Sequence, residues 1–277
     1  MIVHLVDGTY ELFRHFYGVR RFKKVDPPFG AVSGVLRTVV QMLAEGATHV
    51  GVATDHIIES FRNTLWPGYK TGAGIEPALY RQFIPLEEGL AAMGVVVWPM
   101  VELEADDALA SAAHLAALDP DVEKICIWTP DKDLGQCVVG DHVVQVDRRS
   151  GSIRNEEAVR AKFGVNPQFI PDYLALVGDS ADGYPGIAGC GPKTAATLIN
   201  RYGHIEDFPA DVLVEEKRAL ALLFKDLATL RTNAPLFSDV EELRWQGPTS
   251  DFAALAKKID DLRLARQVND LARKILP

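Results

Sequence analysis

The sequence predicts an α/β fold in which a mainly parallel sheet is flanked by helices and followed by a C-terminal region of helices alone. Two observations lead to this class. Short apolar runs of strand type alternate with helical patterns over the first part of the 277-residue chain, and only helical patterns remain after about residue 165. Strands separated by helices usually lie parallel, so the sheet should be mainly parallel.

The first elements follow the order strand, helix, strand. Residues 2–6 form an apolar run that ends at Asp7, residues 30–43 have apolar side chains at helical spacing, and residues 49–53 form the next strand. Residues 95–98 and 124–128 continue the strands, with an alanine-rich helix at 105–118 between them. Glycine and proline cluster at 183–192, and residues 214–230 and 252–275 have the pattern of amphipathic helices.

Composition and charge narrow the class of protein. Hydrophobic residues make up 48% of the chain, but no apolar run could cross a bilayer and no targeting signal is visible, so we expect a cytoplasmic protein. Cys126, Cys137 and Cys190 are odd in number and never spaced as CxxC, which argues against disulfides and a zinc site. The formal net charge of −9 is the wrong sign for a protein that coats nucleic acid, so any DNA contact should be local.

Acidic residues stand where predicted strands end and where the next elements begin. One such acid is usually a cap or turn former, but several of them at one edge of a parallel sheet converge in space. So many carboxylates can share a pocket only if cations neutralise them, and oxygen-only ligands favour Mg²⁺ or Mn²⁺ over zinc. The nine acids are Asp7, Asp55, Glu104, Asp106, Asp107, Asp131, Asp133, Asp179 and Asp182.

A site of this kind predicts hydrolysis of phosphodiester bonds, because a pair of hard cations can activate water and stabilise an in-line displacement. A phosphatase of the haloacid dehalogenase class is the competing hypothesis, since the segment from Asp7 to Thr9 resembles its nucleophile loop. That class needs a second aspartate where this chain has Thr9. The sequence therefore disfavours it.

The glycine-rich segment 186–196 predicts a hairpin between two helices. Glycines let the backbone approach a phosphate, and Lys193 stands at a helix start, where N–H groups favour an anion. Such a hairpin would grip a DNA backbone without reading bases. The alternative is a tight turn between helices with an exposed lysine.

Taken in order, these motifs resemble the 5' nuclease family, which includes bacterial and phage flap endonucleases and the N-terminal nuclease domain of bacterial DNA polymerase I. The similarity covers nearly the whole chain. The motifs lie at 6–9, 12–16, 30–32, 61–62, 69–70, 104–107, 131–134 and 178–180 and in the hairpin of Lys193. Each piece is weak alone, but the ordered set is specific.

The resemblance implies a PIN-like nuclease core at 1–165, with an arch of helices at about 60–90. Residues 166–277 would form a helical region with a helix-hairpin-helix element at about 172–202 that can bind K⁺. All nine acids would bind metal directly or through water, and Lys70, Asp106 and Asp131 would be catalytic. DNA with a 5' flap or 5' end would be the substrate of a protein that we expect to be monomeric. The implied DNA contacts are Arg14, Arg62, Lys70, Gly189, Gly191, Lys193 and Thr194.

The chain departs from the family pattern at several positions. Relatives carry lysines at 56–60, an arginine after the motif at 69–70, and a serine and an asparagine where this chain has Ala181 and Gly183. This thinner basic surface leaves a second hypothesis, a catalytically weak protein that binds DNA junctions. Gly72 and Gly74 disfavour a helix, so we expect the arch to be loop-like without DNA. Because no polymerase segment follows Pro277, we expect a free-standing nuclease.

Overall fold

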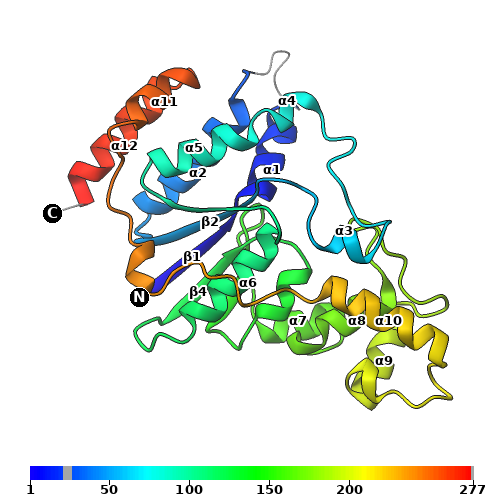
Figure 1. Cartoon of the computed structure of the whole chain (residues 1–277). Helices are drawn as coiled ribbons and strands as arrows, with labels where there is room; N and C mark the ends of the chain where they lie inside the picture. The colour runs from blue at the N-terminus through cyan, green and yellow to red at the C-terminus, as the bar shows by residue number, and fades with distance from the viewer. Residues whose placement is uncertain (21–26, 276–277) are drawn as a thin grey trace.

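The computed structural model describes residues 1–20 and 27–275, and in this part of the chain the centre is a six-stranded sheet of order β3-β2-β1-β4-β5-β6 (Figure 1). The neighbours from β3 to β5 pair in parallel, and β6 pairs with β5 antiparallel. The strands are β1 (Ile2–Asp7), β2 (His49–Asp55), β3 (Val96–Met100), β4 (Lys124–Trp128), β5 (Val143–Asp147) and β6 (Ser152–Arg154). The mainly parallel sheet is confirmed, whereas β5 and β6 were not predicted.

Helices cover both faces of this sheet because their apolar side chains recur at helical spacing. On one face, α1 (Gly8–Arg20), α2 (Gly30–Ala44) and α5 (Phe83–Ala92) share a core with β1 and β2. The other face is covered by α6 (Ala105–Ala116), whose alanines are buried against β1 and β4. The chain runs outward from β1 through β2 to β3, and then returns through α6 to β4 on the other side of β1. The carboxyl ends of these central strands are where such sheets bind ligands.

The segment between β2 and α5 contains only short helices, α3 (Arg62–Leu65) and α4 (Pro77–Tyr80). No helix is present from 66 to 76, so the loop-like backbone expected around Gly72 and Gly74 is confirmed. Two hydrogen bonds hold the middle of this stretch: Lys70 N donates to Asp182 O at 2.9 Å, and Gly72 N donates to a Glu59 carboxylate at 2.9 Å.

Beyond β6, the described chain forms helices alone, as predicted. The elements are α7 (Glu156–Phe163), η2 (Pro167–Phe169), α8 (Ile170–Val177), α9 (Pro192–Tyr202), η3 (Ile205–Asp207) and α10 (Glu215–Ala228), and η1 (Asp133–Cys137) precedes β5. They share a second core, which lies at the end of the molecule opposite α11 and α12 in Figure 1. Helices α8 and α9 with the loop between them form the predicted helix-hairpin-helix.

The last part of the chain returns to the sheet. Trp245 N donates to Thr48 O at 2.9 Å beside β2, and η4 (Val240–Leu243) packs on the α6 face. Helices α11 (Phe252–Lys258) and α12 (Leu262–Ile275) pack against α5 and α2 (Figure 1). Residues 166–277 therefore contribute to two cores, one formed by α8, α9 and α10 and the other shared with α2 and α5. The amphipathic pattern predicted at 252–275 forms α11 and α12, and Asp260 between them has a φ of 56°.

Two further expectations concern cysteines and membranes. Cys126, Cys137 and Cys190 are free thiols, as predicted. Within residues 1–20 and 27–275, no helix is both long enough and apolar enough to span a bilayer.

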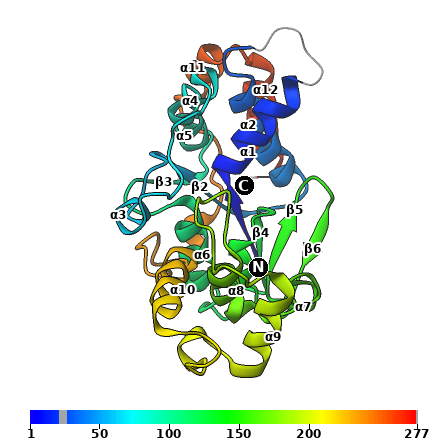
Figure 2. The ribbon, with the colours of Figure 1, turned by 90° about the vertical axis from the view of Figure 1, so that its right-hand side faces the viewer.

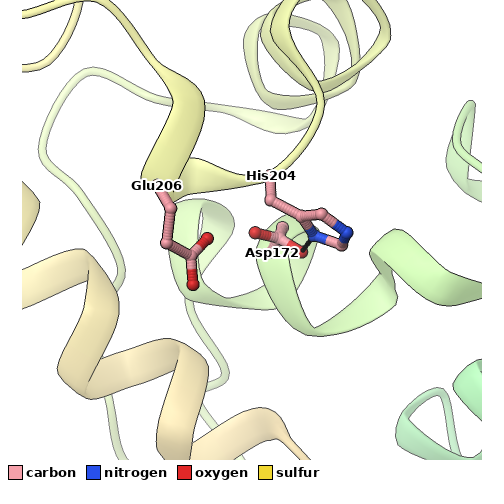
Figure 3. A group of neighbouring side chains, drawn as sticks. All are labelled: Asp172, His204 and Glu206. Carbon is pink, nitrogen blue, oxygen red and sulfur yellow. Dashed lines mark hydrogen bonds and ion pairs between the residues drawn. The ribbon is translucent and has the colours of Figure 1, made fainter.

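An ionic cluster around the buried Asp172 joins three elements of the helical part. Asp172 on α8 is fully buried, and its carboxylate lies 2.9 Å from His204 Nδ1, with Glu206 of η3 beside them (Figure 3). These three side chains are spaced closely enough to hold a metal ion. However, Lys225 of α10 places its ammonium 2.8 Å from Asp172 Oδ1 and 2.7 Å from Glu206 Oε2. Because a cation of the chain already neutralises the carboxylates, we interpret the cluster as structural.

The Lys225→Met substitution tests this interpretation. Methionine keeps the apolar stem but removes the ammonium, which leaves the Asp172 carboxylate short of a charged partner, so we expect the free energy of unfolding to fall by about 2 kcal/mol. Urea unfolding measures the change. The control is Lys258→Met, whose ion pair with Glu88 is exposed and should contribute less than about 0.5 kcal/mol. Equal effects of the two substitutions would refute a special role for Lys225.

Candidate active site

Six of the nine predicted acids line an open pocket of about 410 Å³ at the carboxyl ends of β1 and β2. Among the residues that the structure describes, two sets of three acids each bring their carboxylate oxygens within 4.8 Å of one another. The first set is Asp106, Asp131 and Asp133, and the second is Asp133, Asp179 and Asp182. The sets share Asp133. The acids that line the pocket itself are Asp7, Asp55, Glu104, Asp106, Asp131 and Asp182.

Local hydrogen bonds orient the two acids at the strand ends. Asp7 is the last residue of β1, and its carboxylate accepts from Tyr10 N at 2.8 Å and from Thr129 Oγ1 at 3.0 Å. Asp55 ends β2 and accepts from Ala105 N at 2.8 Å, at the start of α6. Both side chains are therefore held at the sheet edge by neighbouring elements. Acids at helix starts are favoured there by unpaired N–H groups.

Repulsion and burial dominate the electrostatics of the pocket. Burial raises the pKa of Asp7 to about 7, with further increases from the charges of Asp55 and Asp131. Burial, followed by the charge of Asp131, raises the pKa of Asp106 and of Asp133 well above the usual value. Without cations, these carboxyl groups therefore retain protons at a pH where isolated aspartates are ionised.

Two lysines neutralise part of this charge. The Lys70 ammonium lies 2.8 Å from Glu104 Oε2 and 3.0 Å from Asp182 Oδ1, and Lys132 Nζ lies 2.6 Å from Asp179 Oδ2. Burial alone would raise the pKa of Glu104, but the nearby cations, with Lys70 the strongest, lower it overall. Burial would lower the pKa of Lys70, yet Glu104 and Asp182 raise it well above its usual value. Lys70 therefore remains charged inside the pocket.

The donor set fits divalent cations. Asp133 Oδ1 is buried and has no hydrogen-bond partner in the described chain, an arrangement that is unfavourable unless a ligand completes it. The surrounding donors are carboxylate oxygens, which suit hard cations such as Mg²⁺. Asp133 belongs to both sets of carboxylates, so its carboxylate could bridge two neighbouring ions.

Asp107 and Arg62, which were expected to bind metal and DNA, do not line this pocket. Both side chains are buried, and the Arg62 guanidinium donates to both Asp107 oxygens at 2.7 Å. It also donates to Glu104 Oε1 at 3.1 Å and to the carbonyl oxygens of Leu227 and Thr229. These bonds use all the N–H groups of a guanidinium. Arg62 is therefore a buried structural residue, and Asp107 is its partner.

Sequence reasoning missed the apolar wall of the pocket. Tyr10 and Phe13 come from the first turns of α1, and Ile58 and Ile75 come from the segment between β2 and α5. The spacing of Tyr10 and Phe13 immediately after Asp7 was the available signal, because i and i+3 lie on one helix face. Such a wall excludes water from one side of the acids.

The glycine at position 183, one of the departures from the family pattern, is required for steric reasons. Its φ is +85°, and a Cβ atom there would lie 2.0 Å from Gly68 O. An asparagine would therefore clash with the backbone of the segment above the pocket. Trp66 Nε1 donates to Gly183 O at 3.0 Å across the same contact. The two glycines let the loop of Asp179 and Asp182 pack directly on this segment.

The expected DNA contacts outside the pocket lie in different environments. Gly189, Gly191, Lys193 and Thr194 are exposed at the tip of the hairpin and the start of α9. Arg14 instead lines a separate groove of about 600 Å³ and is paired with Glu11 at 2.5 Å. The hairpin is thus accessible to a large ligand, whereas part of the Arg14 guanidinium is already paired with Glu11.

Comparison with known proteins agrees with this arrangement. A family model for the N-terminal resolvase-like domain of 5'-3' exonucleases matches residues 2–164, and a model for their C-terminal SAM fold matches residues 165–251. A 5'-3' exonuclease of Aquifex aeolicus is 30% identical, with the match covering 98% of this chain and 96% of the relative. DNA polymerase I of Pseudomonas aeruginosa is also 30% identical, but the match covers only 31% of that protein.

Solved structures share the fold. The T5 D15 protein co-crystallised with metal ions has a TM-score of 0.66 at 19% identity, with 99% of each chain covered. The catalytic core of Rad2 in complex with DNA substrate has a TM-score of 0.62 at 14% identity, covering 97% of this chain and 91% of that one. The two family models together span the acid-bearing strand ends and the hairpin, and the chain therefore belongs to the 5'-3' exonuclease family.

Proposed function

We propose that the chain is a structure-specific 5' nuclease that hydrolyses phosphodiester bonds at 5' flaps and 5' ends of DNA during replication or repair. The observation that carries this proposal is the two sets of three carboxylates that share Asp133 and border an open pocket, which Lys70 also lines. Family membership and the shared fold of the Rad2 core bound to DNA support it.

The proposed cofactors are two or more Mg²⁺ or Mn²⁺ ions. Their ligands would be Asp7, Asp55, Glu104, Asp106, Asp131, Asp133, Asp179 and Asp182, directly or through water. Such ions, when bound, activate water and neutralise charge on a phosphate in transfer. The family structure of T5 D15 with metal ions supports this assignment. Asp107 is left out because its carboxylate is held by Arg62.

The chain's own residues would position the substrate. Asp106 and Asp131 belong to the same set of three carboxylates as Asp133 and would hold the ions against the scissile phosphate. Lys70 would contact that phosphate. Because Lys70 is one-third exposed, its ammonium can leave Glu104 for a stronger anion. A preformed charge of this kind acts mainly on the transition state.

Binding would rest on the hairpin and not on base contacts. We propose that Gly189, Gly191, Lys193 and Thr194 hold backbone phosphates, with K⁺ as a candidate ion at the helix-hairpin-helix. Exposed backbone N–H groups at the start of α9 suit an anion. The protein would act as a monomer in the cytoplasm.

The first prediction concerns the metal ligands. Asp131→Asn or Asp179→Asn should lower the single-turnover rate on a 5'-flap substrate at least about 100-fold, roughly 2.7 kcal/mol of barrier, because the ions lose a charged ligand. Junction binding should persist. Asp270→Asn on α12, paired with Arg273 at the surface, is the matched control. Full cleavage in excess chelator would eliminate the metal mechanism.

A second prediction separates catalysis from binding at Lys70. Lys70→Ala should lower the single-turnover rate at least about tenfold, equivalent to about 1.4 kcal/mol, with little change in the dissociation constant. The reason is that its charge assists the phosphate as the bond breaks. Rates are measured at saturating metal, so that weaker metal binding does not contribute. An unchanged rate would remove Lys70 from the mechanism.

The third prediction addresses the hairpin. Lys193→Ala should weaken binding by a similar factor for unrelated DNA sequences and lower the slope of log affinity against log salt by about one, since one phosphate contact is lost. Fluorescence anisotropy with non-cleaving Ca²⁺ measures both. Lys257→Ala on α11, exposed at the opposite end of the molecule, is the control. Loss of affinity for some sequences only would contradict a backbone contact.

A further inference from the structure

A short basic surface lies beside the acid pocket and was not predicted from the sequence. It consists of Arg154, at the end of β6, and Lys162, in the last turn of α7. Neither side chain forms an ion pair with any residue in the described ranges, although the chain as a whole is acidic. Their recorded contacts are a neutral amide for Arg154 and the ring of Phe163 for Lys162. Two free cations next to a metal pocket require an explanation.

Arg154 is held at a fixed place relative to Asp131. In the β5–β6 ribbon it pairs directly with Gln145, so both side chains lie on one face. Its guanidinium donates to Gln145 Oε1 at 2.8 Å, and Gln145 Nε2 donates to Asp131 O at 2.6 Å. Gln145 is buried, so this bridge is rigid. The bridge uses one N–H group of Arg154 and leaves most of the others for a ligand.

Lys162 extends the same surface. Its ammonium lies 4.9 Å from the centre of the Phe163 ring, and the side chain is exposed. Burial, followed by the charge of Arg154, lowers its pKa, while Asp131 acts in the opposite sense. Helix α7 packs against β6, so Lys162 and Arg154 lie on neighbouring elements. An anion placed between the two cations would relieve their repulsion.

The surface lies between the pocket and the hairpin. Helix α7 follows β6 and leads through η2 into α8, and Asn200 of α9 donates to Gly164 O at the end of α7 at 2.7 Å. Figure 2 shows β6 and α7 on the same side of the molecule as α8 and α9. A strand held at both the acid pocket and Lys193 would run past Arg154 and Lys162.

We propose that Arg154 and Lys162 form a second phosphate-binding site, which holds a backbone phosphate of the DNA and sets the register of the strand over Asp131. The proposal rests on the proposed nuclease function. The ligand is a phosphodiester, because two cations without an acidic partner in the described part of the chain recognise charge and not sequence. Arg154 is thus a positioning residue that acts through its fixed place beside Asp131.

The experiment compares Arg154→Ala, Lys162→Ala and the double variant on one labelled 5'-flap substrate with Ca²⁺. Each single substitution should lower the slope of log affinity against log salt by about one, and the double variant by about two. At saturating enzyme with Mg²⁺, cleavage by the Arg154 variant should spread to neighbouring positions. Arg154→Lys should restore the salt slope, because it keeps the charge.

Arg148→Ala is the matched control. This arginine follows β5 on the opposite face of the same ribbon, stacked on Trp128 at 5.2 Å, and should change neither slope nor cleavage position. Equal effects of Arg148→Ala and Arg154→Ala would reduce the result to net charge and overturn the proposal. So would a loss of thermal stability in Arg154→Ala with an unchanged salt slope, which indicates a structural role.

The two hypotheses fail differently. A wild-type protein that binds the flap substrate but never cleaves it with Mg²⁺ or Mn²⁺ contradicts the proposed function, and the salt slopes still test the phosphate site. A wild-type protein that cleaves normally, together with variants whose slopes and cleavage positions are unchanged, refutes only the second phosphate site.

Discussion

The buried guanidinium of Arg62 is the interaction on which the rest of the structure depends. It neutralises Glu104 and Asp107, the pair that caps α6 through a reciprocal capping box, and it binds the backbone at the end of α10. Asp106 stands between those two acids, so its direction into the pocket depends on the same contact. Burying an arginine is favourable only when its charge and every donor are satisfied, which holds here. Arg62 therefore stabilises both the start of α6 beside the pocket and the contact between α6 and the end of α10.

Two lysines of the chain neutralise part of the negative charge of the acids in the pocket. Lys70 pairs with Glu104 and Asp182, and Lys132 pairs with Asp179. Burial first, and the charge of neighbouring acids after it, still raise the pKa values of Asp7, Asp106 and Asp133. A cation that enters competes with two flexible ammonium groups and with protons, not with a fixed internal ion. The lysines can then turn to another anion without leaving a buried charge unpaired. This arrangement distinguishes the pocket from the Asp172 cluster, where Lys225 completes the neutralisation.

The sequence was sufficient for the acids at the strand ends, because parallel strands that end in aspartate must meet at one edge. It was less informative where the role of a residue depends on the direction in which its side chain points. Asp106 and Asp107 are adjacent in one motif, yet successive residues of a helix point about 100° apart, so one faces the pocket and the other Arg62. The ribbon of β5 and β6 was missed because β6 spans only Ser152–Arg154. The amphipathic pattern at 252–275 predicted burial but could not name α2 and α5 as the partners.

The contact between Gly68 and Gly183 has a mechanical consequence. Without side chains at these positions, the segment above the pocket and the loop of Asp179 and Asp182 touch backbone to backbone, and hydrogen bonds from Trp66 and Lys70 fasten the contact on both sides. The two segments are therefore coupled through their backbones, and a displacement of residues 66–70 would carry Asp182 and Gly183 with it. Because the Lys70 ammonium also pairs with Asp182, the position of that carboxylate depends on the position of the segment that carries Lys70.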